Sequence, residues 1–171
     1  MHCLLVVTVV ACVGTGVWYL LPLRTSGLSP VELAELALHA PTVTEQTEAV
    51  VQLADFGEEA LAALRRVLDE TTQPDVQSAC LEGLGRLWDY DSMERILDLA
   101  ESGPPRVRGR AAQVVMRMTG RLRRYESNAP EAKRRVLVQY MRQDWDEIQR
   151  ASDEDRNELK RRLRESHEKK S

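Results

Sequence analysis

Arginine is the residue type whose spacing most strongly indicates a binding surface in this chain. Residues 102–125 contain no acidic side chain but seven arginines, namely Arg106, Arg108, Arg110, Arg117, Arg121, Arg123 and Arg124. A guanidinium group is planar and carries several N–H donors, so a row of these groups suits carboxylates, phosphates or lipid headgroups. On a helix that advances by about 100° per residue, Arg106, Arg110 and Arg117 fall within roughly 40° of one another. We call these three residues and Arg121 the arginine ridge, and we expect it to bind a partner.

A structural alternative exists for the same side chains. Acidic residues of neighbouring segments, such as Asp75, Asp98 or Glu101, would neutralise the arginine ridge if the fold places them beside it. A similar choice applies to Trp88 and Tyr90, which fall in a predicted turn between two helices. Exposed aromatic side chains often anchor protein interfaces, whereas buried ones would cover the end of the core. The sequence leaves both questions open.

The residues that usually carry catalysis or bind metals do not form a recognisable pattern. His2, His39 and His167 are scattered along the chain, without a His-Glu-x-x-His or Cys-x-x-Cys motif. Gly83 and Gly85 fall inside a predicted helix, so we expect them to allow a close approach of neighbouring helices rather than to hold a phosphate. We therefore expect no enzymatic activity, no cofactor and no bound metal ion.

Two further candidates for chemistry have simple structural interpretations. Cys80 takes the place of an apolar residue on a predicted inner helix, so we expect an inert buried thiol rather than a nucleophile. Asp89, Asp91 and Glu94 crowd one turn, but they lack the spaced acids and the glycine of a calcium loop. We expect Asp91 or Ser92 to cap the next helix and Asp89 to support the turn.

The distribution of charge argues against a nucleic-acid partner. Residues 24–120 hold 9 basic and 16 acidic side chains, whereas residues 121–171 hold 15 basic and 11 acidic ones. Proteins that bind nucleic acid usually present a strongly basic domain. The predicted body of this protein is acidic, and only its C-terminal part is basic.

An uncharged, mostly apolar run begins at Cys3 and ends at Leu23. About 20 such residues cross the hydrocarbon core of a bilayer as a helix, so we expect a single membrane span from Leu4 to Leu23. A cleavable signal peptide is the alternative; it would normally carry a basic residue ahead of a shorter apolar region, and the mature chain would begin near Ser26. Arg24 is the only fixed positive charge close to the run, so the side of the membrane on which the rest of the chain lies stays open.

Helix start and stop signals divide the rest of the chain into short helices. Ser29 and Thr42 each lie three positions before a glutamate, which predicts helix starts at Pro30 and Val43. Asp75 is expected to cap a later helix. Four residues of the second helix lie at helical spacing and form its predicted apolar stripe, namely Val50, Val51, Leu53 and Ala54. The predicted stop signals are Pro41, Gly57, Gly103 and Gly120.

The clearest architectural signal is an internal repeat. Residues 74–81 and 105–112 carry the same pattern in register, 31 residues apart. A repeat unit of this size presents an apolar face that it cannot bury alone, so successive units stack and expose an elongated surface. We therefore predict an all-α fold, a short α-solenoid of antiparallel helix pairs.

The repeated segments resemble the short HEAT-like repeats of bacterial proteins related to phycobilisome lyases. The unit of that family, Asp-Pro-x-Val-Arg-x-x-Ala-x-x-Ala-Leu-Gly, is matched by Pro74, Asp75, Val76, Ala79, Leu84 and Gly85, and then by Val107, Arg108, Ala111 and Ala112. The sequence departs from the pattern by inverting Asp-Pro and by placing Gln77 where an arginine is usual. The resemblance covers about residues 42–120 and implies a binding scaffold. A minority of the family attach or modify bilin chromophores, and no residue here specifically matches a lyase.

The chain after Gly120 is predicted to form two further helices. Five apolar residues of the first form a stripe that we expect to cover the end of the array, namely Val136, Leu137, Tyr140, Met141 and Trp145. The second carries only Leu159 and Leu163 as apolar residues, so we expect it to project or fray. The predicted organisation is a transmembrane anchor or signal-anchor (1–24), a linker and first helix (25–41), the repeat array (42–120), a capping helix region (121–150) and a charged C-terminal helix (151–171).

Together these features predict a non-catalytic, membrane-tethered helical-repeat scaffold of bacterial type that binds a protein partner. The arginine ridge, Trp88 and Tyr90 are its candidate contact residues. Two other functions stay open. One is a secreted or periplasmic accessory subunit of an enzyme, including a lyase-like one, with a cleaved leader. The other is a binder of anionic lipid or RNA through the arginine ridge, which would lose affinity steeply with added salt.

Overall fold

The protein is all-helical over residues 27–151 and 153–169, which its computed structural model describes, and the predicted all-α class is confirmed. Within these residues the chain forms eight α-helices and no strand. Their bounds are α1 Pro30–His39, α2 Val43–Ala54, α3 Leu61–Glu70, α4 Pro74–Arg86, α5 Met93–Ser102, α6 Pro105–Thr119, α7 Glu131–Arg150 and α8 Asp153–Glu168. Two short 3-10 helices, η1 Gly57–Ala60 and η2 Tyr90–Ser92, precede α3 and α5.

The predicted membrane anchor cannot be compared with this structure, because residues 4–23 lie outside the described part of the chain. Among the residues that are described, no helix has both the length and the apolar character needed to cross a bilayer.

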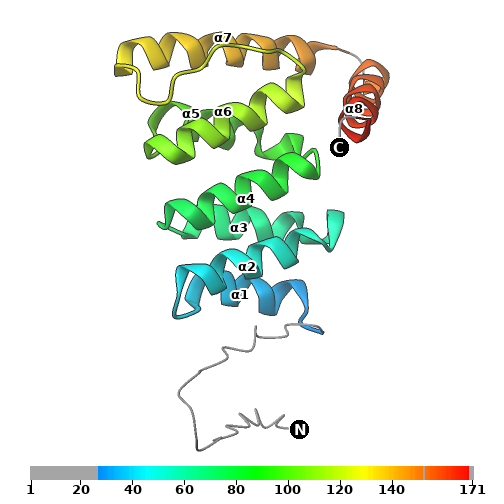
Figure 1. The fold of residues 1–171 in the computed structure, drawn as a ribbon. Helices are drawn as coiled ribbons and strands as arrows, with labels where there is room; N and C mark the ends of the chain where they lie inside the picture. The colour runs from blue at the N-terminus through cyan, green and yellow to red at the C-terminus, as the bar shows by residue number, and fades with distance from the viewer. Residues whose placement is uncertain (1–26, 152, 170–171) are drawn as a thin grey trace, which may run out of the picture.

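The helices are piled one on another from α1 at one end to α7 at the other (Figure 1). In one row α2 packs on α4 and α4 packs on α6. In the other row α1 packs on α3 and α5 packs on α7, while Arg95 of α5 pairs with Asp69 of α3 at 2.8 Å. The rows are joined where α1 meets α2, α3 meets α4 and α5 meets α6. One apolar core runs through the whole stack.

The starts of the first two helices follow directly from the sequence. Ser29 and Glu32 form a reciprocal capping box at α1, and Thr42 and Glu45 form another at α2. Each box satisfies backbone N–H groups that a helix start leaves without partners. Gly120 ends α6 with φ 68°, a left-handed conformation that glycine adopts without a steric penalty. The predicted starts of α1 and α2 and the predicted end of α6 are confirmed, whereas α2 ends at Ala54, before the predicted stop at Gly57.

Two glycines allow α4 to lie unusually close to its neighbours. A Cβ atom at Gly83 would lie 3.2 Å from the Cβ atom of Ala54 on α2. A Cβ atom at Gly85 would lie 2.8 Å from a methyl group of Val114 on α6, which is closer than side chains tolerate. The prediction that these glycines permit close helix packing is confirmed.

A side chain at equivalent positions of α2, α4 and α6 ties each helix to the one before it. In each case a side-chain N–H donates to the backbone carbonyl of the C-cap residue of the preceding helix. The three pairs are Gln46 with Ala40 (3.0 Å), Gln77 with Thr71 (3.0 Å) and Arg108 with Gly103 (2.8 Å). The donors are spaced by 31 residues, so the interval of the sequence repeat coincides with a repeated contact in space.

Some of the ion pairs between described residues also follow this interval. The three pairs that join residues 31 positions apart are Glu35 with Arg66 (2.7 Å), Asp55 with Arg86 (2.8 Å) and Asp75 with Arg106. The side chains in these pairs are substantially exposed, and such pairs each contribute only about 0–1 kcal/mol. These ion pairs therefore show how successive helices are aligned, but they contribute little to the stability of the fold.

The α7 helix buries only part of the predicted stripe, since Met141 and Trp145 are buried as predicted. Val136 and Tyr140 are 49% and 47% exposed. The side chains buried from α7 are those of Val138, Met141, Asp144, Trp145 and Ile148. A carboxylate is tolerated in that stripe because Arg123 donates two hydrogen bonds to Asp144, at 2.7 and 2.6 Å.

The last helix, α8, does not project from the rest of the protein. It lies beside the stack, next to the ends of α4 and α6 (Figure 1). Leu159 and Leu163 pack against the core, and a methyl group of Leu163 lies 2.9 Å from the position that a Cβ atom of Gly120 would take. Arg164 of α8 also donates to the backbone carbonyl of Leu87 at 3.5 Å, so both apolar and polar contacts dock this polar helix.

Candidate interaction surface

The arginine ridge lies along α6 and the residue after its C-cap, where carboxylates of neighbouring helices pair with it. Arg106 pairs with Asp75, and both Arg110 and Arg117 pair with Glu82 of α4, at 3.0 and 2.8 Å. Arg121 pairs with Glu147 of α7 at 3.4 Å. These contacts are the ones expected from the structural alternative, in which acidic side chains of adjacent segments neutralise the arginine ridge. Asp75 is one of the acids that the sequence singled out for this role.

Asp75 takes part in this pairing because it does not cap α4. The N-cap position belongs to Gln73, and Pro74 occupies the first helical position. Asp75 therefore lies inside the first turn, where its carboxylate faces the next helix of the row. The Arg106 side chain remains 71% exposed despite the pairing, so it is still accessible to a partner. The role of the ridge in binding stays a prediction.

The other arginines of this segment hold the chain between α6 and α7. Arg108 donates to the carbonyl of Ser127 at 2.9 and 2.6 Å, in addition to its bond with Gly103. Arg123 holds Asp144, and this hydrogen bonding raises the pKa of the Arg123 guanidinium. Arg124 is almost fully exposed and lies 3.7 Å from Glu126. Two of the seven arginines thus have structural roles that spacing alone did not reveal.

Trp88 and Tyr90 cover the end of the core rather than standing free at a turn. Trp88 is 5% exposed, and its indole ring meets His167 of α8 edge-on at 6.2 Å. The hydroxyl of Tyr90 donates to the carbonyl of Met118 at 3.2 Å, and burial raises the pKa of that hydroxyl. The ring of Tyr90 also contacts Trp145 at 5.4 Å. Trp88 therefore offers a partner little surface in this structure.

The burial of Trp88 is linked to how α4 ends. Trp88 has φ 58°, the left-handed conformation that glycine usually supplies at this position. The N–H of Asp89 donates to Leu84 at 3.0 Å and the N–H of Trp88 donates to Gly85 at 3.4 Å, which closes the helix in a Schellman motif. A bulky residue is costly in this conformation, and the burial of the indole offsets that cost.

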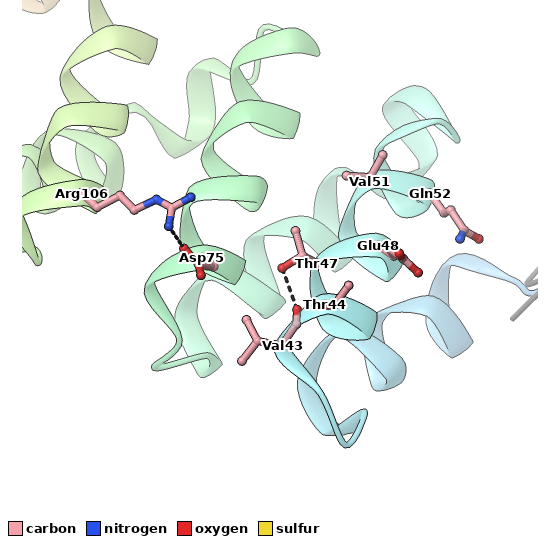
Figure 2. Close-up of a pocket in the computed structure, with 8 residues that line it drawn as sticks. All are labelled: Val43, Thr44, Thr47, Glu48, Val51, Gln52, Asp75 and Arg106. Atoms are coloured by element: carbon pink, nitrogen blue, oxygen red, sulfur yellow. Dashed lines mark hydrogen bonds and ion pairs between the residues drawn. The ribbon is translucent and has the colours of Figure 1, made fainter. Parts of the chain in front are cut away.

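An open groove of about 430 Å³ lies on the face of the row formed by α2, α4 and α6 (Figure 2). Its apolar wall consists of Val43 and Val51 of α2, and Val51 is 51% exposed. Thr44, Thr47, Glu48 and Gln52 of α2 add hydrogen-bonding groups, and Asp75 with Arg106 closes the other side. Val51 was predicted to face the core with Val50. On a helix, however, adjacent residues point about 100° apart, so only Val50 is buried.

The sequence contained a signal for this groove. Val43, Thr47 and Val51 are spaced by four residues and so lie on one side of α2. Val50, Leu53 and Ala54 form the buried side. Two valines outside the buried stripe therefore mark a second apolar strip, and one end of the arginine ridge faces it.

Among the described residues, the side chains that the sequence suggests as candidates for catalysis are buried or engaged in structural contacts. Cys80 is buried, and burial raises the pKa of its thiol to about 12, which keeps it protonated. Asp89 is also buried; it accepts hydrogen bonds from Arg65 and from Ser92, so it supports the turn as predicted. No group of three or more metal-ligating side chains occurs in residues 27–151 and 153–169.

No protein family, curated protein or solved structure was found to match this chain.

Proposed function

We propose that this protein is a non-catalytic, membrane-tethered scaffold, a short HEAT-like α-solenoid that binds a protein partner. The repeated contacts at intervals of 31 residues support the solenoid part of the proposal, since each unit meets the next through equivalent positions. The tether rests on the uncharged apolar sequence that ends at Leu23.

The groove along α2 is the observation that carries the binding function. An exposed apolar strip with hydrogen-bonding groups at its edge is typical of a surface that receives a segment of another protein. Val43 and Val51 would contact apolar side chains of the partner. Glu48 makes no ion pair with any described residue, so it favours a partner that places a basic side chain there.

The arginine ridge has a secondary role in this proposal. Arg106 borders the groove and is exposed, whereas Arg110 and Arg117 share Glu82. Pairing with Asp75 leaves Arg106 able to donate further hydrogen bonds from its planar guanidinium. It would fix the orientation of the bound segment through a carboxylate or a backbone carbonyl.

A pair of matched valine substitutions tests the proposed function. Val51→Arg would place a charge in the apolar strip, while Val136→Arg changes an equally exposed valine on α7, outside the groove. Full-length protein is crosslinked in its native membrane, and the captured proteins are identified by mass spectrometry. We expect a small, reproducible set of partners that is lost with Val51→Arg and kept with Val136→Arg. Equal capture by both variants would contradict a role for the groove.

A further inference from the structure

A second concave site lies where α8 meets the stack, away from the α2 groove. This cleft has a volume of about 560 Å³ and is bordered by η2, the start of α5, the last turns of α7 and the middle of α8. Its lining includes the aromatic residues Tyr90 and Trp145, the acids Asp91 and Glu94, and the basic residues Arg156 and Lys160. Arg156 donates a hydrogen bond to the backbone carbonyl of Gln149 at 3.5 Å. Since α8 contributes one wall, the cleft exists only because that helix folds back.

The wall opposite α8 is aromatic. The rings of Tyr90 and Trp145 lie 5.4 Å apart with an angle of 49° between their planes. The Tyr90 hydroxyl is already bonded to the backbone of α6, so the ring is held in place. Trp145 is 4% exposed, so the partly exposed ring of Tyr90 provides most of the surface against which an apolar group can pack at little entropic cost.

The α8 wall supplies an ammonium group without a carboxylate partner. The Nζ atom of Lys160 lies 5.6 Å from the centre of the Tyr90 ring, and no described carboxylate comes within ion-pair distance of it. Burial, and then the charge of Arg164, lower the pKa of Lys160. The negative charges of Glu58, Asp89 and Asp91 act in the opposite direction and offset these two effects only in part.

The acids at the rim of the cleft are already engaged elsewhere. Asp91 pairs with Arg65 at 3.0 Å, and Glu94 pairs with Arg142 at 2.7 Å. Neither forms an ion pair with Lys160, although the charge of Asp91 partly stabilises its ammonium group. Their negative charges still lie nearby, so they would repel a doubly charged phosphate more strongly than a singly charged carboxylate.

Trp145 provides a second donor. Its Nε1 atom is buried and has no hydrogen-bond acceptor within the described residues. A buried donor without a partner is destabilising, so an acceptor that reaches it would be bound favourably. The atom is covered in the absence of a ligand, so an entering acceptor must first displace a side chain of the wall.

We propose that this cleft binds a carboxylate ligand that carries an apolar group. The carboxylate accepts from the ammonium of Lys160 and, once a side chain of the wall has moved, from the indole N–H of Trp145, and the apolar group packs against the ring of Tyr90. The carboxylate belongs either to a small organic acid or to an acidic side chain of a bound peptide. Occupancy of the site ties α8 to the stack, since its donors lie on α8 and on α7.

The indole N–H resonance of Trp145 gives a direct test. Full-length ¹⁵N-labelled protein in lipid nanodiscs is titrated with phenylacetate and, separately, with its uncharged isostere phenylacetamide. We expect phenylacetate to move the indole proton resonance of Trp145 downfield in a saturable manner, and phenylacetamide to leave it in place. Trp145→Phe identifies the resonance. Equal shifts with both compounds, or no saturation with phenylacetate, would overturn the proposal.

Substitutions of lysine then identify the positive charge that binds the carboxylate. Lys160→Met should weaken phenylacetate binding roughly tenfold or more, Lys160→Arg should retain most of it, and Lys169→Met, which changes an exposed lysine of the same tail, should have no effect. Unchanged affinity with Lys160→Met would refute the assignment. Both positions lie in the α8 segment, outside the core of the stack.

A peptide pair identifies the source of the carboxylate. Acetyl-Leu-Glu-amide and acetyl-Leu-Gln-amide differ only in the charge of one side chain. Tighter binding of the glutamate peptide than of phenylacetate would assign the site to a protein ligand, and the reverse order would assign it to a small acid. Equal binding of the two peptides would contradict recognition of a carboxylate. These measurements do not depend on the α2 groove, so either proposal can fail alone.

Discussion

The first six helices and the last two are held in place by different chemistry. From α1 to α6 the contacts are made by fully buried aliphatic side chains, and small residues let the helices touch. In contrast, the buried stripe of α7 includes a carboxylate, that of Asp144. The α8 helix contributes two partly buried leucines to the core. The stack is thus a continuous apolar structure, whereas its C-terminal end depends on a few specific polar and apolar contacts.

The two parts of the molecule differ in what their contacts provide: those of the stack mainly stabilise the fold, and those of the C-terminal end mainly specify how its helices dock. Burial of a leucine side chain contributes about 1.5–3 kcal/mol wherever the surroundings are apolar, so the stack gains free energy from many interchangeable contacts. A buried ion pair contributes little net free energy, but it penalises arrangements in which either partner is left alone. The C-terminal end therefore has one favoured docking position with a small margin of stability, which suits a region that binds ligands.

The largest effect is expected from Leu64→Ala in the centre of the stack. Leu64 is fully buried against α4, so its truncation should lower the free energy of unfolding by about 3 kcal/mol. Urea denaturation followed by circular dichroism measures the change. Leu61→Ala, in the first turn of the same helix and only partly buried, serves as the control and should cost clearly less. Equal losses would contradict a continuous core at this position.

Gly85→Ala should have the next largest effect. The added methyl group meets Val114 at 2.8 Å, and the strain should cost about 2 kcal/mol. Combining it with Val114→Ala makes room for the methyl group, so the double variant should lose less than the sum of the two single variants. Thermal unfolding of the wild type, the two single variants and the double variant measures the coupling energy between the two positions. Strict additivity would show that α4 and α6 do not need their close approach.

Arg123→Ala probes the polar contact that fixes α7. It leaves the carboxylate of Asp144 buried without its two donors, which should cost about 1–2 kcal/mol. Arg124→Ala, the adjacent and highly exposed arginine, is the matched control and should have almost no effect. The comparison is made by urea denaturation. If both variants were equally stable, α7 would be held by its apolar residues alone.

Leu163→Ala should loosen α8 without unfolding the stack. Because Leu163 is only partly buried, we expect the free energy of global unfolding to change by less than about 1 kcal/mol. Hydrogen exchange of the α8 amides should become markedly faster while exchange in α4 is unchanged. A simultaneous increase in both helices would show that α8 and the stack form one cooperative unit.

The smallest effect is expected at the capping box of α1, which has no counterpart at α7. Hydrogen bonds from the backbone and the hydroxyl of Ser29 lower the pKa of Glu32 below its usual value of 4.5. Its stabilising contribution is therefore present above that pH and is lost as the pH falls through the lowered value. Glu32→Gln should reduce the melting temperature slightly at neutral pH and not at all in acid. A difference that is the same at every pH would exclude the charge as its cause.

Much of the fold was predictable because its signals are local. Ser29 with Glu32 and Thr42 with Glu45 define helix starts within four residues of chain, and Gly120 defines an end. The interval of 31 residues also appears in the contacts of Gln46, Gln77 and Arg108. The role of these three side chains was not predicted, since a donor and its carbonyl at the end of another helix share no local pattern.

The candidate sites were less predictable than the helices. Three features depend on which helices pack together and on how each helix is rotated about its own axis. They are the exposed position of Val51, the burial of Trp88 and the docking of α8. Asp75 was an expected helix cap and also a possible partner of the ridge, and only the position of α6 separated the two roles. The cleft around Lys160 had no signal in the sequence, because its walls come from segments far apart along the chain.

The sequence by itself determined the helices, their order and the interval at which they repeat, because these follow from backbone hydrogen bonding and from the period of apolar residues along a few turns. Only the tertiary structure decided which charges are paired, which aromatic rings are covered and where a groove or cleft is left open. Those properties depend on distances between segments that are remote in the chain, and such distances are set by the packing of whole helices rather than by any single stretch of residues.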